Sequence, residues 1–148
     1  ELDKPLDHPA AKDWWADENV YVVSGGKITT LAELGRDAGL RPNMFQAYLL
    51  REETFDNIFY REAWGFNRHR LDKPIMISEH REAGLCVGIT ADHAYFLLSN
   101  ASNPCTDIML AFGNLAPGAT AGATGRVWIK PGRAGDFLSE AYAIEAIQ

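Results

Sequence analysis

The fold class is decided by residues 85–98, which read LCVGITADHAYFLL in one-letter code. Both ends of this segment are rich in the β-branched, aromatic and aliphatic residues that are common in β-strands. Between them lies Ala91-Asp92-His93, a polar stretch with the length of a hairpin loop. The segment therefore predicts two strands that pair as an antiparallel hairpin.

Similar segments follow one another from about residue 73 onward. Strands are expected at residues 74–78, 108–112 and 125–130, with Gly, Pro or Asn after each. The last of them, GRVWIK, alternates between apolar and polar residues, as a half-buried strand does. Short strands separated by such turns are typical of β-sandwiches and barrels. The Leu115-Ala116-Pro117-Gly118 turn is similar to turns in immunoglobulin-like and carbohydrate-associated sandwich domains, which supports the same fold class.

The remaining segments predict helices and a first hairpin, so the expected fold is α+β. Residues 20–23 and 28–31 flank a turn at Ser24-Gly25-Gly26 and predict a hairpin. Asp136 is expected to cap a C-terminal helix that places Phe137, Ala141 and Ile144 on one face. We expect a single domain at 1–148 with an N-terminal arm (1–19), a mixed segment (20–72) and a mostly antiparallel β-sandwich or barrel from about residue 73.

Residues 31–50, LAELGRDAGLRPNMFQAYLL, carry the most helix-like pattern and predict a short helical insertion near residues 31–52. Thr30 can act as N-cap, and Gly39 ends the first helix. Pro42 begins a second helix, which is expected to reach about Glu53. This pattern resembles a helix-turn-helix, whose second helix reads DNA bases. The resemblance implies that residues Arg41, Asn43 and Gln46 would contact DNA. Alternatively, residues 43–50 form a strand that is apolar on both faces.

The net charge of −6 counts against nucleic acid as the main ligand. Only residues 21–81, with nine basic and eight acidic side chains, are not biased against a polyanion. No apolar run is long enough to span a membrane, so a soluble chain is expected. The chain begins at Glu1 without a methionine, which is compatible with a processed secreted or periplasmic protein but leaves its location open.

Motifs for metal, cofactor or nucleophilic chemistry are not recognisable. The four histidines, among them His69, His80 and His93, show no pair at metal-ligand spacing, although they could converge on a β-scaffold. Cys86 and Cys105 lie in apolar, strand-like runs, where structural cysteines are common, and their pairing is left open. The sequence therefore predicts no metal site and no cofactor.

Residues 60–70 are the expected ligand-binding segment. Aromatic rings alternate here with arginine, asparagine and histidine, which suits a sugar or an anionic sugar. The same pattern also fits an aromatic core whose arginine heads reach solvent. The candidate ligand-binding residues are Arg61, Glu62, Trp64, Asn67, Arg68, His69 and Arg70.

Three functions are compatible with these patterns. The leading expectation is a non-catalytic binding or assembly module that recognises a carbohydrate, a larger protein partner or a second copy of itself. The first alternative is a helix-turn-helix DNA-binding protein that uses residues 31–50. The second alternative is a small enzyme that acts on a sugar-like substrate through residues 60–70.

Overall fold

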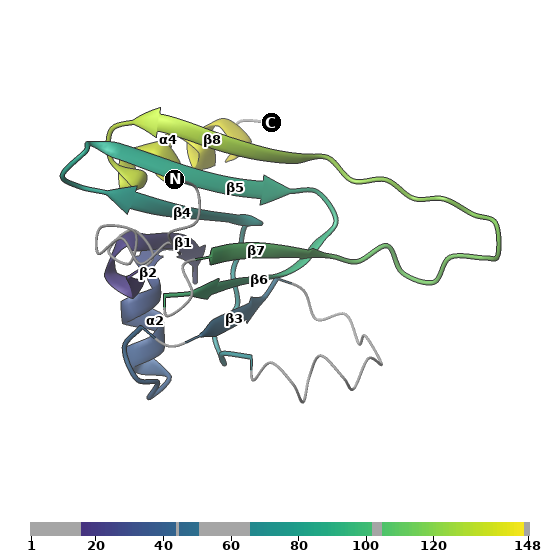
Figure 1. Cartoon of the computed structure of the whole chain (residues 1–148), viewed down its shortest axis with the longest axis horizontal. Coiled ribbons are helices and arrows are strands. Elements are labelled where there is room, and N and C mark those ends of the chain that lie inside the picture. Colours follow the sequence, from purple (N-terminus) through teal and green to yellow (C-terminus); the bar gives the residue numbers. More distant parts are fainter. Residues whose placement is uncertain (1–15, 44, 51–65, 102–104, 147–148) are drawn as a thin grey trace, which may run out of the picture.

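The computed structural model describes residues 16–43, 45–50, 66–101 and 105–146, and Figure 1 shows their arrangement. Within these ranges the chain forms two antiparallel β-sheets that do not close into a barrel. A short helix follows the first hairpin, and a longer helix ends the described part. The expected α+β fold with a sandwich-like pair of sheets is therefore confirmed. None of the described helices has the length and hydropathy needed to cross a membrane.

The larger sheet has five strands in the order β2-β1-β4-β5-β8, and the smaller sheet has three in the order β3-β6-β7. Strands from both halves of the chain thus lie side by side in the larger sheet. The larger sheet contains β1 (Val20–Ser24), β2 (Lys27–Thr30), β4 (Ile75–His80), β5 (Leu85–Ala91) and β8 (Gly125–Pro131). The smaller sheet contains β3 (Gln46–Leu49), β6 (Ala94–Asn100) and β7 (Cys105–Leu110).

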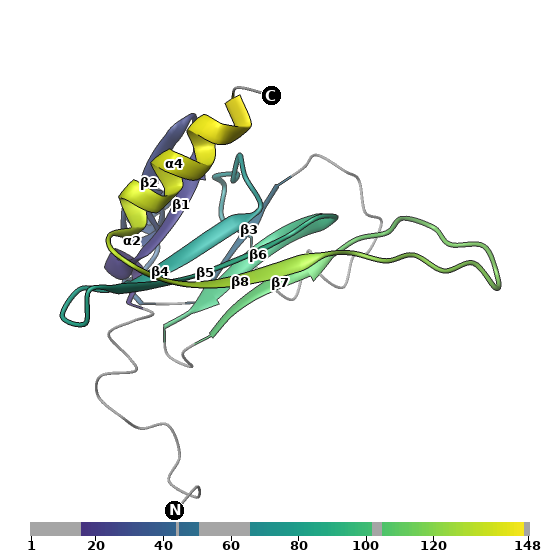
Figure 2. The same cartoon turned by 90° about the horizontal axis from the view of Figure 1, so that it is seen from above.

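The elements stack as layers, with the larger sheet between α4 (Ala134–Ala146) and the smaller sheet (Figure 2). One core lies between α4 and the larger sheet and includes Ile77, Cys86 and Leu138. A second core lies between the sheets and includes Val22 and Leu97. Strands β4 and β6 are buried on both faces, which explains why Ile75–Ile77 and Ala94–Leu98 are apolar runs without alternation.

The first hairpin and its helix form as expected. Gly25 and Gly26 have φ angles of 61° and 74°, which the tight turn between β1 and β2 requires and which glycine adopts at little cost. A 3-10 helix, η1 (Asp17–Asn19), precedes β1. Helix α2 (Leu31–Asp37) begins with a complete capping box formed by Thr30 and Glu33.

The second helix expected from Pro42 is wrong over the described residues, because residues 46–49 form β3. Gly39, with a φ angle of 75°, turns the chain after α2, and the chain then enters the smaller sheet. Gly35 faces the side chain of Gln46, whose Oε1 would lie 3.0 Å from an added Cβ. The small residue therefore admits a strand side chain against the helix, as the alternative strand interpretation of residues 43–50 requires.

The hairpin expected at residues 85–98 is also wrong, although both strands and the turn between them exist. Strand β5 pairs with β4 and β8, whereas β6 pairs with β3 and β7. His93, with a φ angle of 53°, lies in the turn at which the chain passes from one sheet to the other. Local sequence identifies a tight turn, but each strand pairs instead with its other neighbour in the chain, β5 with β4 and β6 with β7, and a more distant strand occupies its second edge.

Two expectations near the C-terminus are corrected as well. Strand β8 is exposed along nearly its whole length rather than half-buried, because it lies at the edge of the larger sheet. Asp136 lies inside the first turn of α4 and does not cap it. The acceptor for the Ala134 N–H is instead the carboxylate of Glu79 on β4, at 2.9 Å. Side chains beyond Ala141, including that of Ile144, are not described.

Candidate functional site

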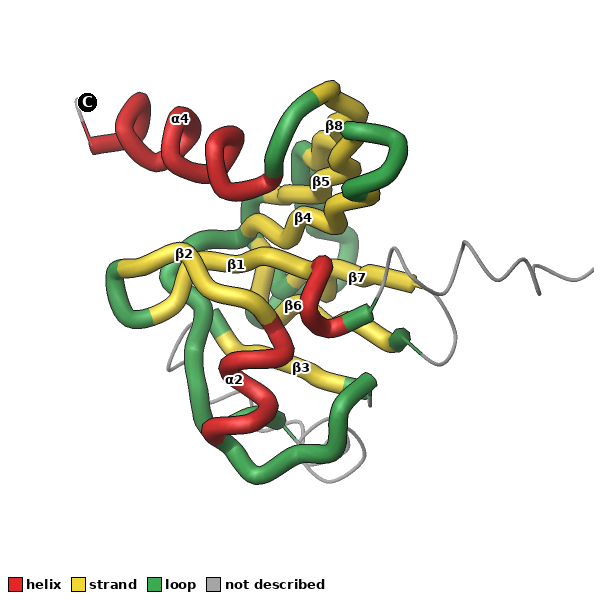
Figure 3. Tube along the Cα trace, turned by 90° about the vertical axis from the view of Figure 1, so that its left-hand side faces the viewer, coloured by secondary structure: helices red, strands yellow, loops and turns green. Residues whose placement is uncertain are grey.

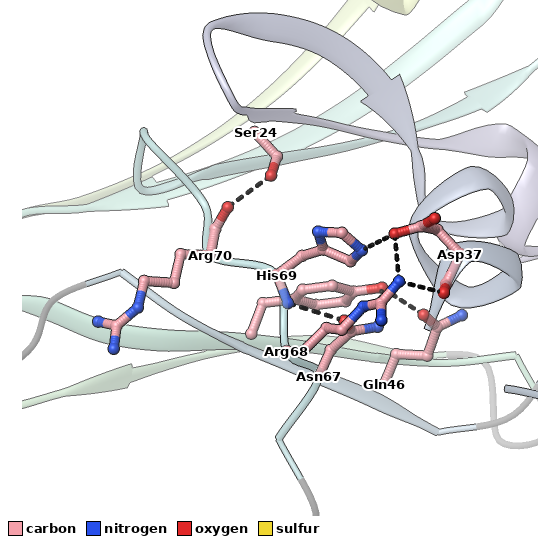
Figure 4. Close-up of polar contacts among 8 residues, drawn as sticks. Ser24, Asp37, Gln46, Asn67, Arg68, His69 and Arg70 are labelled. Carbon is pink, nitrogen blue, oxygen red and sulfur yellow. Dashed lines mark hydrogen bonds and ion pairs between the residues drawn. The ribbon is translucent and has the colours of Figure 1, made fainter. Parts of the chain in front are cut away.

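The predicted ligand segment and the predicted DNA-contacting segment lie next to each other. Residues 66–72 run beside β3, where the Asn67 N–H donates to the Ala47 carbonyl at 2.8 Å and the Leu71 N–H donates to the Leu49 carbonyl at 3.0 Å. Figure 4 shows the polar side chains that meet between this segment, α2 and β3. We call this set the polar cluster; it consists of Asp37, Gln46, Tyr48, Asn67, Arg68 and His69.

The inner half of the polar cluster is a buried hydrogen-bond chain. The Tyr48 hydroxyl donates to Gln46 Oε1 and accepts a hydrogen bond from Asn67 Nδ2 at 3.2 Å. Asn67 Oδ1 in turn accepts from the backbone N–H of His69 at 3.0 Å. Burial raises the pKa of the Tyr48 hydroxyl well above its usual range, and the nearby Asp17 carboxylate adds to this effect. Tyr48 therefore stays protonated and serves as a hydrogen-bond donor.

The outer half of the polar cluster is an exposed ion-pair group. Asp37 Oδ2 lies 2.6 Å from an Arg68 Nη and 2.7 Å from His69 Nε2. Hydrogen bonds from Arg68 and then His69 hold the pKa of the Asp37 carboxyl below its usual range. Both Arg68 and Asp37 are more than half exposed, so this pair adds little to stability.

The remaining predicted residues divide into three groups. Arg70 and Arg41 are exposed, and the Arg70 backbone carbonyl accepts a hydrogen bond from Ser24 Oγ at 2.6 Å. Asn43 Oδ1 accepts from the Asp17 N–H at 3.0 Å, while Gln46 is 1 % exposed. DNA contact by these residues stays a prediction, but Gln46 is too deeply buried to reach a base without rearrangement. Arg61, Glu62 and Trp64 lie outside the described residues.

The polar cluster joins the two sheets. Its segment is bonded to β3 of the smaller sheet, and the Asp72 N–H donates to the Val23 carbonyl of the larger sheet at 2.8 Å. Asp72 Oδ2 also accepts from the Gly26 N–H at 2.7 Å. Most polar side-chain atoms of the polar cluster bond to other residues of the protein, so its geometry favours a structural role over catalysis.

A second candidate surface, not expected from the sequence analysis, is a projecting arm between β7 and β8. Residues 112–124 extend past the ends of both sheets, as Figures 1 and 2 show, and all of them are exposed. The arm ends in a turn in which the Ala119 N–H donates to the Ala116 carbonyl at 2.9 Å. Pro117 and Gly118, with a φ angle of 83° at the glycine, suit the two central positions of a type II turn.

The root of the arm is fixed by the turn at Asp92 and His93. Asp92 exchanges two hydrogen bonds with Thr124: its N–H donates to the Thr124 carbonyl at 3.1 Å, and its Oδ1 accepts from the Thr124 N–H at 2.7 Å. On the other side, the Ala111 N–H donates to the His93 carbonyl at 2.9 Å. The His93 and Phe112 rings also pack at a centroid distance of 5.5 Å. Both ends of the arm are therefore held in place where it leaves the body.

Exposed apolar side chains gather on and beside this arm. The described residues include six large hydrophobic side chains that are exposed, and five of them belong to β7, the arm or β8. On β8, Val127 is 69 % exposed and Ile129 is 72 % exposed. Trp128 packs on Phe137 of α4, so its two neighbours point to the opposite face of the sheet. The five are Leu110, Phe112, Leu115, Val127 and Ile129.

The sequence carries a signal for this surface. Residues 108–125 contain no charged side chain, although 23 % of the chain is charged. An exposed segment normally carries charged side chains, so the lack of charge distinguishes this arm from an ordinary surface loop. The residues Leu115-Ala116-Pro117-Gly118 at its centre predict a turn, but they do not predict that the segment projects from the body.

Comparison with known proteins adds no family or fold neighbour: no family model matches the chain, and neither a curated protein nor a solved structure is similar to it. Function must therefore be argued from the chain's own geometry. In the described ranges, no three His, Cys, Asp or Glu side chains lie close enough together to hold a metal ion. Cys86 and Cys105 are not paired, and burial raises the pKa of both thiols.

Proposed function

We propose that the protein is a non-catalytic assembly module, in which two copies associate by placing the arm of each on the β8 edge of the other. The observation that carries this proposal is the arm itself, which is fully exposed, uncharged and fixed at its root. An arm that served only to connect β7 and β8 would not need to leave the body, because Ala111 and Thr124 are already anchored at the same turn.

The arm and β8 offer complementary backbone groups. The two legs of the arm form no ladder with each other, since the turn at Ala116–Ala119 holds the one backbone hydrogen bond within residues 112–123. Strand β8 pairs with β5 on one side, and no strand of the described ranges pairs with its other edge. In β-strand addition, an extended segment pairs with an unpaired strand edge. The N–H and C=O groups of the arm and those of the β8 edge would then all have hydrogen-bond partners.

The side chains favour a second copy over a membrane as the partner. Val127 and Ile129 offer apolar surface beside the β8 edge, and Leu115 offers it on the arm. Segments that bind membranes typically carry basic and aromatic anchors; the arm has no basic residue, and its one aromatic residue, Phe112, packs on His93 at the root. An open strand edge also needs hydrogen-bonding partners, which hydrocarbon does not provide. Every copy carries both the arm and the edge, so reciprocal pairing closes a twofold dimer.

Sedimentation velocity of the full chain between about 1 and 100 µM tests the proposal. The expected result is a reversible dimer. Leu115→Asp on the arm and Ile129→Lys on β8 should each weaken association at least tenfold, which is about 1.4 kcal/mol or more. Both side chains are exposed, so both variants should keep the melting temperature of the parent protein.

Leu40→Asp is the matched control, because Leu40 is an exposed leucine outside the arm and the β8 edge, with 40 % of its surface accessible. This variant should dimerise like the parent. A parent protein that remains monomeric at 100 µM would overturn the proposal. So would a dimer that survives both interface substitutions, or one that Leu40→Asp weakens equally.

A further inference from the structure

A cavity of about 530 Å³ lies between α4 and the larger sheet, at the end of the sheet from which the arm leaves. Helix α4 packs against β1, β2 and β4, and residues at the arm-proximal ends of β5 and β8 line the cavity. Figures 2 and 3 show α4 running from the end of β8 towards β1 and β2. The volume falls within the range of cavities that bind small molecules, roughly 300–1,000 Å³.

The interior of the cavity is apolar. Val23, Ile75 and Leu138 form buried parts of its wall and are at most 8 % exposed. The ring of Trp128 lines one side and is held by its edge-on contact with Phe137, at a centroid distance of 5.5 Å. Ala141 contributes a small side chain from α4. Such a lining suits an aliphatic chain and offers few polar partners.

The lining of the cavity also includes charged side chains, namely the cations Lys73 and Arg126 and the carboxylate Asp92. Asp92 already accepts a hydrogen bond from the Thr124 N–H at 2.7 Å. Arg126 is exposed, and its side chain leaves β8 on the same face as Trp128. A carboxylate is a head group that arginine binds through two parallel hydrogen bonds.

We propose that this cavity binds a medium-chain aliphatic carboxylate, with its hydrocarbon chain between α4 and the larger sheet and its head group on Arg126. The inference is separate from the dimer, since Thr124 is the one cavity residue in the arm, and Arg126 and Trp128 leave β8 on the face towards α4, opposite Val127 and Ile129. A ten-carbon chain serves as the probe, because the cavity volume lies in the range of sites that hold small molecules.

Isothermal titration calorimetry of the full chain with decanoate, below its micelle concentration, tests this inference. Decanoate should bind with one site per chain and a micromolar dissociation constant. Decyltrimethylammonium, which has the same chain and a cationic head, should bind at least tenfold more weakly. Arg126→Gln should weaken decanoate at least tenfold and leave decanol unchanged, and Arg36→Gln on α2 is the matched control that should bind decanoate normally.

Ala141→Phe fills the cavity from α4 and should abolish binding of decanoate and decanol alike. Because this variant could disturb α4, its melting temperature and circular dichroism are measured with the same sample. Leu115→Asp should bind decanoate like the parent, which separates the cavity from the apolar arm. The inference is overturned if the parent does not bind decanoate, if Arg126→Gln leaves decanoate binding unchanged, or if the folded Ala141→Phe variant still binds it.

Discussion

Removing the Glu79 carboxylate should destabilise the whole domain, because this side chain connects β4 to the first turn of α4. Glu79 is 1 % exposed, and its Oε2 accepts the Ala134 N–H at 2.9 Å. Its Oε1 lies 2.8 Å from Arg133 Nε and 3.5 Å from Arg81 Nε. One carboxylate therefore caps the helix and binds two arginines.

The expected cost of Glu79→Ala is about 2–4 kcal/mol. Ala134 is fully buried, so leaving its N–H without an acceptor costs about 1–3 kcal/mol. Losing a negative charge at the N-terminus of a helix adds roughly 0.5–1 kcal/mol. The arginine side chains are 52 % and 60 % exposed, so their ion pairs add less than about 1 kcal/mol. Glu79→Gln keeps an acceptor and loses only the charge, and should cost about 1–2 kcal/mol.

Urea and thermal unfolding at neutral pH measure both variants. For a chain of this size the Glu79→Ala melting temperature should fall by roughly 5–15 °C. Glu82→Ala is the matched control, since Glu82 is an exposed glutamate in the following turn, and its effect should stay within about 0.5 kcal/mol. A Glu79→Ala variant as stable as the parent, or alanine and glutamine variants of equal stability, would refute the reasoning.

Three further predictions concern stability and reactivity. Thr30→Ala removes the N-cap of α2 and should cost about 1 kcal/mol in urea unfolding, whereas Thr30→Ser should cost much less; equal losses would contradict the capping box. Burial raises the pKa of the Cys86 and Cys105 thiols. Alkylation near pH 8 should therefore be at least about tenfold slower in the native protein than in urea. Equal rates would show that the thiols are accessible. Burial raises the pKa of the Asp17 carboxyl above its usual 3.8 in the folded state. The protonated carboxyl therefore stabilises the fold below pH 3.8, and this stabilisation is lost as the pH rises through the folded-state pKa. Asp17→Asn should therefore gain stability relative to the parent between pH 3.5 and 7, and a stability difference that does not change with pH would contradict the raised pKa.

Much of the local structure could be predicted from the sequence, because short-range signals fix it. The double glycine after β1, the capping box at Thr30 and the glycine after α2 each act within a few residues, and all three have the expected roles. Pairing between strands is different, since it depends on which distant segments compete for an edge. The turn at His93 was visible in the sequence, but the strands beside it belong to different sheets.

The candidate site was less predictable than the fold. The sequence predicts a polar ligand segment at residues 60–70, but the partners of Asn67 and Arg68 come from β3 and α2 and are not visible in a local pattern. The sequence of residues 31–50 predicts two helices. The same small and apolar positions, among them Gly35, also suit one helix that packs on a strand, and that is the arrangement found. The arm is not predictable from the sequence, because an exposed run without charge has the same composition as a buried strand.

The interleaving of the two sheets has a consequence for how the chain folds. Tyr21 lies opposite Ile77 and Tyr48 lies opposite Leu97, so each pairing closes a loop of about fifty residues. Such long-range contacts raise the contact order and slow folding relative to a domain built from adjacent hairpins. The larger sheet also needs β8 to cover β5, and β8 is the last of the described strands. During synthesis, β5 therefore has an open edge until residues 125–131 leave the ribosome, and this edge is the part of the nascent chain most exposed to mispairing with another molecule.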